Sequence, residues 1–149
     1  MQKKLAEQFA AEKLLEHKLT QKKWIFSWNT RKKAVGLCNY KRKIIFYSEE
    51  FFKISTEAQF KDVILHEIAH ALVGPGNGHN EVWKKMCIKI GAKPERLCQG
   101  IKLVPYKYSA KCHYCYKKYG CYRKLKNMTA RYCKEFPACT KKPLVFKEG

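Results

Sequence analysis

Apolar side chains recur at helical spacing in some parts of this chain and alternate with polar ones in others. Between residues 56 and 72 the spacing predicts a buried helix. Ser55 and Thr56 are candidate N-caps, and Gln59 three residues after Thr56 completes a capping-box pattern. Residues 74–78, which include three glycines, predict the end of this helix and a tight turn. The apolar stripe comprises Phe60, Val63, Ile64, Ile68, Ala71 and Leu72.

Two further helices are expected. One covers residues 80–90, with Asn80 as its cap and Gly91 at its C-terminal end. The other lies within residues 1–18, where apolar and charged positions form an amphipathic pattern. The inward positions expected are Val82, Trp83, Met86, Cys87 and Ile90 in the first helix, and Leu5, Phe9, Ala10, Leu14 and Leu15 in the second.

A small sheet is expected from residues 23–28 and 43–47, which are rich in β-branched and aromatic residues. Residues 36–40 lie between these runs, with turn chemistry near Asn39. The order of elements predicts an α+β fold, with helices packed on one side of a small sheet. We expect two domains, residues 1–103 and a small module formed by residues 104–149.

The segment His66-Glu67-Ile68-Ala69-His70 reads H-E-x-x-H within the predicted central helix. Histidines four residues apart lie on one helical face, so both rings can point at one metal ion. Glu67 flanks that face, where its carboxylate can take a proton from metal-bound water as general base. This pattern indicates the catalytic zinc site of a hydrolase, because zinc lowers the pKa of bound water toward about 7.

A catalytic zinc ion usually has three protein ligands, so a third is needed. His79 is the first candidate because it follows the glycine turn directly and precedes the next helix. Glu81 is the alternative, since carboxylates also bind zinc. In the simplest competing interpretation, the paired histidines are ordinary polar residues on a half-buried helix.

Five of the eight cysteines lie after residue 110. Reducing compartments disfavour disulfides, so clustered cysteines in an intracellular protein indicate a metal site. We predict a zinc ribbon with one structural zinc ion, in which the metal replaces the core that so short a segment cannot supply. Cys121 or His113 could substitute for one ligand, and ordinary free thiols are the competing interpretation. The predicted ligands are Cys112, Cys115, Cys133 and Cys139.

The net charge of +20 is spread unevenly, because residues 101–149 carry 13 basic and two acidic side chains. The same region holds seven of the nine tyrosines. Cationic side chains neutralise phosphates and aromatic rings stack on exposed bases, so we expect DNA binding, to single-stranded or distorted DNA ahead of regular duplex. A lysine-rich surface kept for solubility is the alternative. The candidate contacts are Lys111, Lys117, Lys118, Arg123, Lys124, Lys126, Arg131, Tyr114 and Tyr116.

The chain has no run of eighteen apolar residues, which argues against a transmembrane helix and a membrane partner. Charged residues run through its first eighteen positions, unlike the apolar core of a signal peptide. We therefore expect an intracellular protein, which is cytoplasmic or, in a eukaryote, nuclear. We also expect a monomer.

Several motifs occur together in this chain. They are residues 26–29, 34–38 and 44–48, the H-E-x-x-H segment, Gly78-His79, Trp83 and the ribbon cysteines. In this combination they resemble the SprT-like family, which includes the Spartan proteases. The resemblance implies a zincin-type metalloprotease that degrades proteins bound or crosslinked to DNA, with a ribbon that helps to engage DNA. By motif match it makes His66, His70 and His79 the zinc ligands and Glu67 the catalytic residue.

Two other classes of function remain open at this point. One is a non-catalytic nucleic-acid-binding zinc protein, in which four protein ligands would close the first metal site. The other is a general zinc peptidase without a nucleic-acid role.

Overall fold

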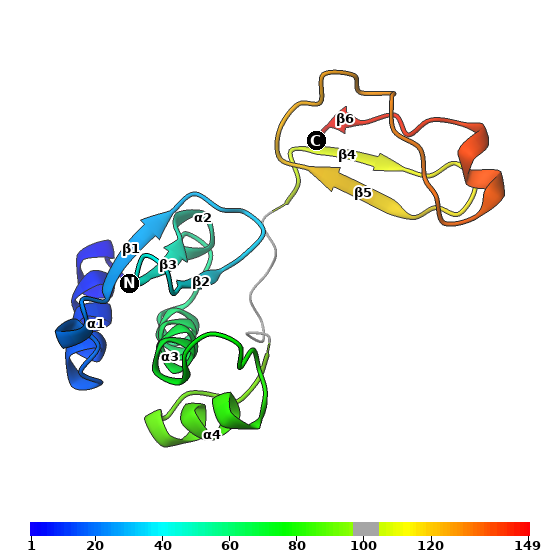
Figure 1. Ribbon diagram of the computed structural model, residues 1–149. Coiled ribbons are helices and arrows are strands. Elements are labelled where there is room, and N and C mark those ends of the chain that lie inside the picture. The colour runs from blue at the N-terminus through cyan, green and yellow to red at the C-terminus, as the bar shows by residue number, and fades with distance from the viewer. Residues whose placement is uncertain (97–104) are drawn as a thin grey trace. The chain divides into compact units, whose positions relative to one another are not determined.

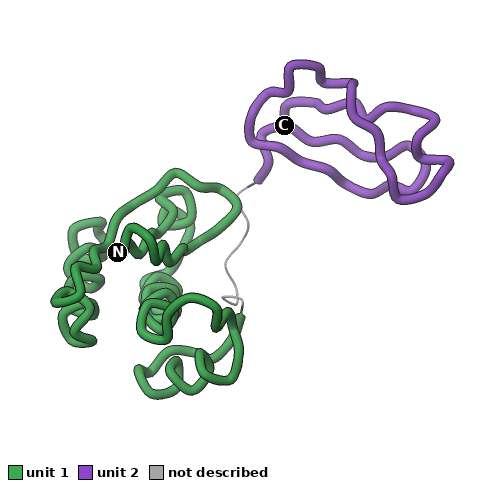
Figure 2. The backbone as a smooth tube through the Cα atoms, in the orientation of Figure 1, with its two compact units in different colours: residues 1–103 green, residues 104–149 purple. Residues whose placement is uncertain are grey.

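The computed structural model describes residues 1–96 and 105–149. The chain divides into two compact units, which we call unit 1 (residues 1–103) and unit 2 (residues 104–149) (Figure 2). Helices and small sheets occur together, so the predicted α+β class is confirmed (Figure 1). Each unit is described by itself.

Unit 1 contains a three-stranded sheet formed by β1 (Ile25–Asn29), β2 (Gly36–Asn39) and β3 (Ile44–Ser48). The strand order is β1-β3-β2, with β1 parallel and β2 antiparallel to β3. The central strand β3 is mostly buried, as its apolar sequence requires. β2 thus occupies one end of the sheet, in a segment for which the sequence indicated only a turn near Asn39.

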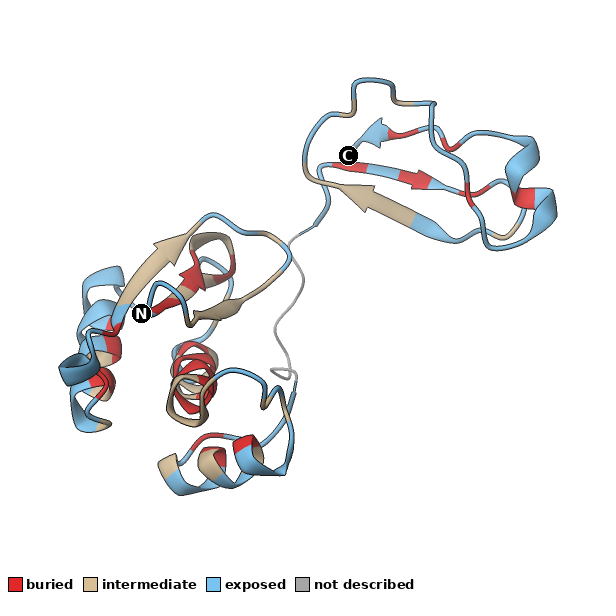
Figure 3. Ribbon diagram, in the orientation of Figure 1, coloured by how far each residue is buried: buried red, intermediate tan, exposed pale blue. Residues whose placement is uncertain are grey.

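The helices of unit 1 are α1 (Lys3–Glu16), α2 (Glu49–Phe52), α3 (Glu57–Val73) and α4 (Glu81–Ile90), with a short 3-10 helix, η1 (Thr20–Lys22). α3 contacts α1, α4, β2 and β3, which makes it the central element of the unit. Burial in unit 1 is greatest along α3 and β3 (Figure 3).

The predicted ends of α3 and α4, the two helices on either side of the glycine turn, are confirmed. The Thr56 side chain accepts a hydrogen bond from the Gln59 backbone N–H (3.2 Å), and the Gln59 side chain accepts one from the Thr56 N–H (2.9 Å). Asn80 caps α4 by accepting from the Trp83 N–H (3.1 Å). Gly91 ends α4 with a φ of 78°, which a glycine adopts without steric cost.

The core of unit 1 is built around Phe60 on α3, whose side chain is fully buried. Aromatic rings from α1, β1, β3 and α2 surround it at centroid distances of 4.8–6.4 Å. Such pairs contribute about 0.5–1.5 kcal/mol each beyond the area they bury. These rings belong to Phe9, Phe26, Trp28, Tyr47 and Phe52.

The predicted inward faces of two helices were partly wrong. Leu5 and Leu15 of α1 are 53% and 64% exposed, whereas Ala6, Ala10 and Leu14 are buried. The three buried positions are four residues apart and line one face, and two of them are small enough for the helix to lie close against its neighbours. Val82 of α4 is likewise exposed, although Trp83 and Cys87 are buried as expected.

Unit 2 contains an antiparallel sheet in the order β5-β4-β6, formed by β4 (Tyr108–Lys111), β5 (Lys118–Cys121) and β6 (Lys147–Glu148). A 3-10 helix, η2 (Pro137–Lys141), follows the long connection after β5. The core of this unit consists of seven buried residues, three of which are cysteines of the predicted ribbon. They are Tyr108, Ala110, Cys112, Cys133, Cys139, Leu144 and Phe146.

Candidate metal centres

Three histidines of unit 1 converge at the C-terminal end of α3. The Nε2 atom of His79 lies 3.1 Å from that of His66 and 3.2 Å from that of His70. Two nitrogen ligands at about 2.0–2.1 Å from a tetrahedral zinc ion lie roughly 3.3–3.4 Å apart, so these spacings fit a shared metal. Within the described part of the chain this group of potential ligands has three members, which leaves a fourth coordination position for water or substrate.

The glycine turn explains how His79 reaches the other two histidines. Gly74, Gly76 and Gly78 all have positive φ, between 49° and 88°, and so reverse the chain at little steric cost. The Asn77 side chain donates to the carbonyl of Val73 at 2.8 Å and ties the turn to the end of α3. His79 is thereby held next to the capped start of α4.

A buried tryptophan packs against the histidine group. The ring centroid of Trp83 lies 4.7 Å from that of His66, 5.2 Å from that of His70 and 4.6 Å from that of His79. Trp83 has no exposed surface, so its indole fills the space beneath the three imidazoles. Their orientation is thus fixed by packing as well as by the backbone.

Burial keeps the histidines in the form that binds metal. It lowers the pKa of His66 and of His70 to about 4 each, and the neighbouring histidines act in the same direction. Burial and the nearby Arg96 also lower the pKa of His79. All three imidazoles are therefore neutral near pH 7, and no proton has to leave before a cation binds.

Glu67 is buried beside this group. Burial raises the pKa of its carboxyl to about 8, against the opposing effect of a hydrogen bond from the Cys38 backbone. The carboxylate lies directly against β2, because a Cβ atom at Gly36 would come within 2.7 Å of its Oε1 and 2.8 Å of Val63 Cγ1. Only a glycine at position 36 leaves room for Glu67 in this place.

The histidines and Glu67 open into a cleft of about 730 Å³. One wall is the segment before β2 together with β2 itself. Sequence reasoning missed Lys33, Tyr40 and Arg96 in the lining, and it gave Gly36 no role at the site. Lys33, Gly36 and Tyr40 lie in and around β2, whereas Arg96 comes from the segment after α4. Glu81, the alternative third ligand, lies outside the group and pairs with Lys84 at 2.8 Å.

A comparison with protein families agrees with this geometry. The model of the SprT-like family matches residues 3–103. The chain belongs to the SprT-like family. This family is generally associated with metalloprotease-like domains. A search of curated proteins returned no match. Within residues 1–96 and 105–149, no helix of this SprT-like chain is long and apolar enough to cross a membrane.

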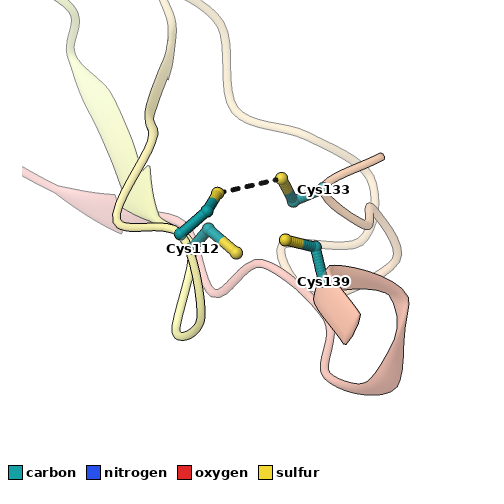
Figure 4. Close-up of side chains that lie close together, drawn as sticks. Cys112, Cys133 and Cys139 are labelled. Carbon is teal, nitrogen blue, oxygen red and sulfur yellow. Dashed lines mark hydrogen bonds between the residues drawn. The ribbon is translucent and has the colours of Figure 1, made fainter. Parts of the chain in front are cut away.

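The SprT-like chain has a second candidate metal site in unit 2. The four predicted cysteines place their Sγ atoms within 4.8 Å of one another. Figure 4 shows Cys133 and Cys139 pointing toward Cys112. The Cys115 and Cys133 sulfurs are 3.6 Å apart, close to the roughly 3.8 Å expected of two thiolates on a tetrahedral zinc ion. The donor set therefore fits a closed, four-thiolate site.

Backbone and side-chain hydrogen bonds prepare these sulfurs for metal. The Cys112 N–H donates to the Lys117 carbonyl (3.0 Å), which folds the chain around the first cysteine pair. A hydrogen bond from the Cys115 backbone lowers the pKa of Cys112 to about 7. The Tyr119 hydroxyl donates to Cys133 Sγ at 2.9 Å and lowers the pKa of that thiol. Both effects favour the thiolate, which is the metal-binding form. Burial raises the pKa of the Cys139 thiol to about 12, and the pKa of Cys115 is raised against a hydrogen bond from the Lys117 backbone, so these two thiols lose their protons less readily.

The two alternative ribbon ligands lie outside this group. Cys121 is partly buried and packs against the core of unit 2, and the exposed His113 ring lies against that of Tyr114.

All nine candidate DNA-contact residues are exposed. Lys117 forms an ion pair with Glu135, and the Lys111 ammonium lies over the Tyr116 ring, 4.7 Å from its centroid. Exposed aromatic rings that were not among the candidates are those of Tyr106, Tyr132 and Phe136. DNA contact through this surface stays a prediction.

Proposed function

We propose that this chain is a zinc-dependent endopeptidase that acts on proteins bound or crosslinked to DNA. In this proposal residues 1–103 form a zincin-type metalloprotease domain, and residues 104–149 form a basic zinc ribbon that binds DNA. The observation that carries the enzymatic part is the convergence of three neutral imidazoles and one buried carboxylate in an open cleft.

His66, His70 and His79 would hold the catalytic ion. A zinc ion bound there supplies Lewis acidity and lowers the pKa of bound water toward about 7. Glu67 accepts the proton of the attacking water, since burial makes its carboxylate a stronger base than an exposed one. The protonated Glu67 then passes that proton to the leaving amine. The Cys38 backbone N–H and the close approach of Gly36 hold the carboxylate in place.

The position of β2 supports peptide cleavage in particular. β2 lies at the end of its sheet and lines the same cleft as the histidines. In the described structure its only strand partner is β3, so its outer edge can pair with an extended peptide. Such pairing would lay a substrate backbone along Gly36, Leu37 and Cys38, beside Glu67.

The DNA-binding part of the proposal rests on the charge of unit 2. Unit 2 has twelve basic side chains and only two acidic ones, Glu135 and Glu148. Each of these two glutamates already pairs with a lysine. The excess of cations, together with exposed tyrosines, suits a single-stranded polyanion whose bases are free to stack.

A non-catalytic zinc protein is the competing function. A structural zinc site is normally closed by four protein ligands, as the cysteine group would be. Among the described residues the histidine group offers three, in a cleft large enough for a peptide, which favours catalysis.

The decisive experiment measures cleavage of casein and histone by the zinc-loaded protein, with and without single-stranded DNA. We expect chelation to abolish cleavage and Glu67→Gln to reduce it by roughly 10²–10⁴-fold while the metal content is unchanged. Glu81→Gln, an exposed glutamate exchanged in the same way, is the control and should cleave normally. Cleavage by Glu67→Gln at the wild-type rate would refute the enzymatic assignment. Equal cleavage rates with and without DNA would indicate a general peptidase without a nucleic-acid role.

A further inference from the structure

The region around β2 carries a dense positive charge on unit 1 itself. We propose that it binds a nucleic-acid backbone beside the cleft, as a second contact surface separate from unit 2. We call this surface the β2 collar. The inference rests on the proposed function for its partner, DNA, and places part of the DNA contact on the protease unit. The collar consists of Arg31, Lys32 and Lys33 before β2, and Lys41, Arg42 and Lys43 after it.

The charge of this region is not balanced locally. Residues 17–48 contain nine lysines and arginines and no aspartate or glutamate. Elsewhere in unit 1, lysines pair with glutamates, as in Lys3–Glu49, Lys61–Glu57 and Lys84–Glu81. Between described residues, no salt bridge includes Arg31, Lys33, Lys41, Arg42 or Lys43. A surface of this kind concentrates positive potential and attracts polyanions.

The backbone of the collar is held in place on both sides of the strand. The Arg31 N–H donates to the Asn29 side chain at 2.9 Å, and the Arg31 carbonyl accepts from the Ser48 hydroxyl. After β2, the Arg42 N–H donates to the Asn39 side chain at 3.0 Å. The two basic runs are thus fixed at opposite ends of one strand, about 10 Å or more apart at roughly 3.4 Å per residue.

The collar continues into the cleft. Lys33 belongs to it and also lines the cleft, as does the cation Arg96. Among the described residues of that lining, Glu67 is the only acidic one, and it is buried. The accessible charge at the mouth of the site is therefore positive. DNA bound at the collar would keep a protein attached to that DNA within reach of Glu67 and the histidines.

The spacing and the second cationic unit favour nucleic acid over an acidic protein segment. A polynucleotide presents charge continuously, so one strand can span both ends of β2. It can also contact unit 2 of the same molecule, and binding at one surface then raises the effective concentration at the other. A short acidic peptide gains little from two surfaces of this kind.

The test uses the full-length, zinc-loaded protein and a fluorescein-labelled oligo-dT. The triple variant Lys41→Gln, Arg42→Gln and Lys43→Gln is compared with Lys84→Gln, Lys85→Gln and Lys89→Gln on α4, which removes the same charge elsewhere. Each phosphate contact contributes about 0.7 to the slope of log K against log[salt] for single strands. We expect the collar variant to lose about 2 in this slope and about tenfold or more in affinity at 0.1 M salt. The α4 variant should stay near wild type.

Several outcomes would overturn the proposal. A collar variant with the slope and affinity of the wild type is one, and an equal loss in the α4 variant is another. Binding of poly-glutamate that the collar variant loses, while its oligo-dT binding is unchanged, would assign the surface to acidic protein segments instead. Thermal unfolding of both variants checks that they are folded. Cleavage of a DNA-free peptide by the wild type separately reports the proposed enzymatic function, whose failure would leave the affinity result intact.

Discussion

The two candidate metal sites differ in how they relate to the cores around them. The histidine group lies at the edge of unit 1, in an open cleft, and the aromatic cluster around Phe60 packs without it. The cysteine group lies inside unit 2 and supplies three of its seven core residues. Under the proposed function, a metal ion would serve chemistry in the first site and hold the fold together in the second.

The two sites also differ in how their surroundings shift the pKa values of the ligands. Burial lowers the pKa of His66 and His70, because a low-polarity environment disfavours the cation. Burial disfavours a thiolate, and it raises the pKa of Cys139 to about 12. Hydrogen bonds act in the other direction at Cys112 and Cys133, as that from Tyr119 does for Cys133. Neutral ligands suit a site that has to admit substrate, whereas four thiolates suit one that stays closed.

Metal removal should give the largest difference in folding between the two units. Structural zinc sites contribute about 10–16 kcal/mol to the folding of small zinc peptides, which exceeds the stability expected of a domain as small as unit 2. We expect a chelator to unfold residues 105–149 while α1, α3 and α4 stay helical. Amide dispersion in NMR spectra and circular dichroism at 222 nm report the two effects. Unchanged dispersion of unit 2 after complete metal removal would contradict the comparison.

Single cysteines should distinguish ligands from neighbours. Cys133→Ala removes a buried member of the sulfur group and should cost the protein one equivalent of zinc and the fold of unit 2. Cys121→Ala, a partly buried neighbour, should keep both metals and cost only about 1 kcal/mol. Native mass spectrometry gives the metal count. Loss of a metal from the Cys121 variant would show that the four-sulfur group is incomplete.

Gly36→Ala should damage the histidine site without emptying it. The new Cβ would meet Glu67 at 2.7 Å, so the carboxylate or β2 has to move, and we expect kcat/KM to fall tenfold or more with zinc retained. Gly91→Ala is the matched control. Its φ of 78° makes alanine strained there by about 1 kcal/mol, but nothing lies within 4 Å, so activity should persist. Equal activities for the two variants would argue against the role given to Gly36.

The smallest expected effect concerns the stability of metal-free unit 1. The pKa of Glu67 is raised from 4.5 to about 8, so the folded state binds more protons than the unfolded state in that window, and stability falls as pH rises through it. The lowered pKa values of His66 and His70 make stability rise with pH between about 4 and 6.5. This contribution is the same in the wild type and in the variant Glu67→Gln. Glu67→Gln should therefore gain Tm relative to wild type between pH 5 and pH 8. A difference in Tm that does not vary with pH would rule out this account.

The sequence predicted those features that depend on local chemistry. Residues a few positions apart determine the capping box at Thr56, the Asn80 cap and the turn before His79. Such local features can be predicted from the sequence. The convergence of His66, His70 and His79 follows from helical spacing and one turn.

The features that the sequence left open depend on tertiary pairing. The position of β2 at the end of the sheet places Gly36 against Glu67. No pattern within residues 36–40 predicts that contact. The prediction that Leu5 faces inward on α1 was wrong, because a small side chain at Ala6 lets the helix lie close against its neighbours, so that Ala6 is buried and Leu5 is exposed. Lys33 and Arg96 meet at the cleft from distant segments, which composition alone does not reveal.

Trp83 gives the histidine site an optical reporter of its own. Its indole lies within 4.6–5.2 Å of all three imidazoles, whereas Trp24 and Trp28 make their ring contacts with Tyr40 and with the aromatic cluster of unit 1. A paramagnetic ion such as Co²⁺ seated among the histidines would quench the emission of this indole through direct proximity. Fluorescence titration could then follow loading of the cleft without any label, whether or not a metal ion is bound in unit 2.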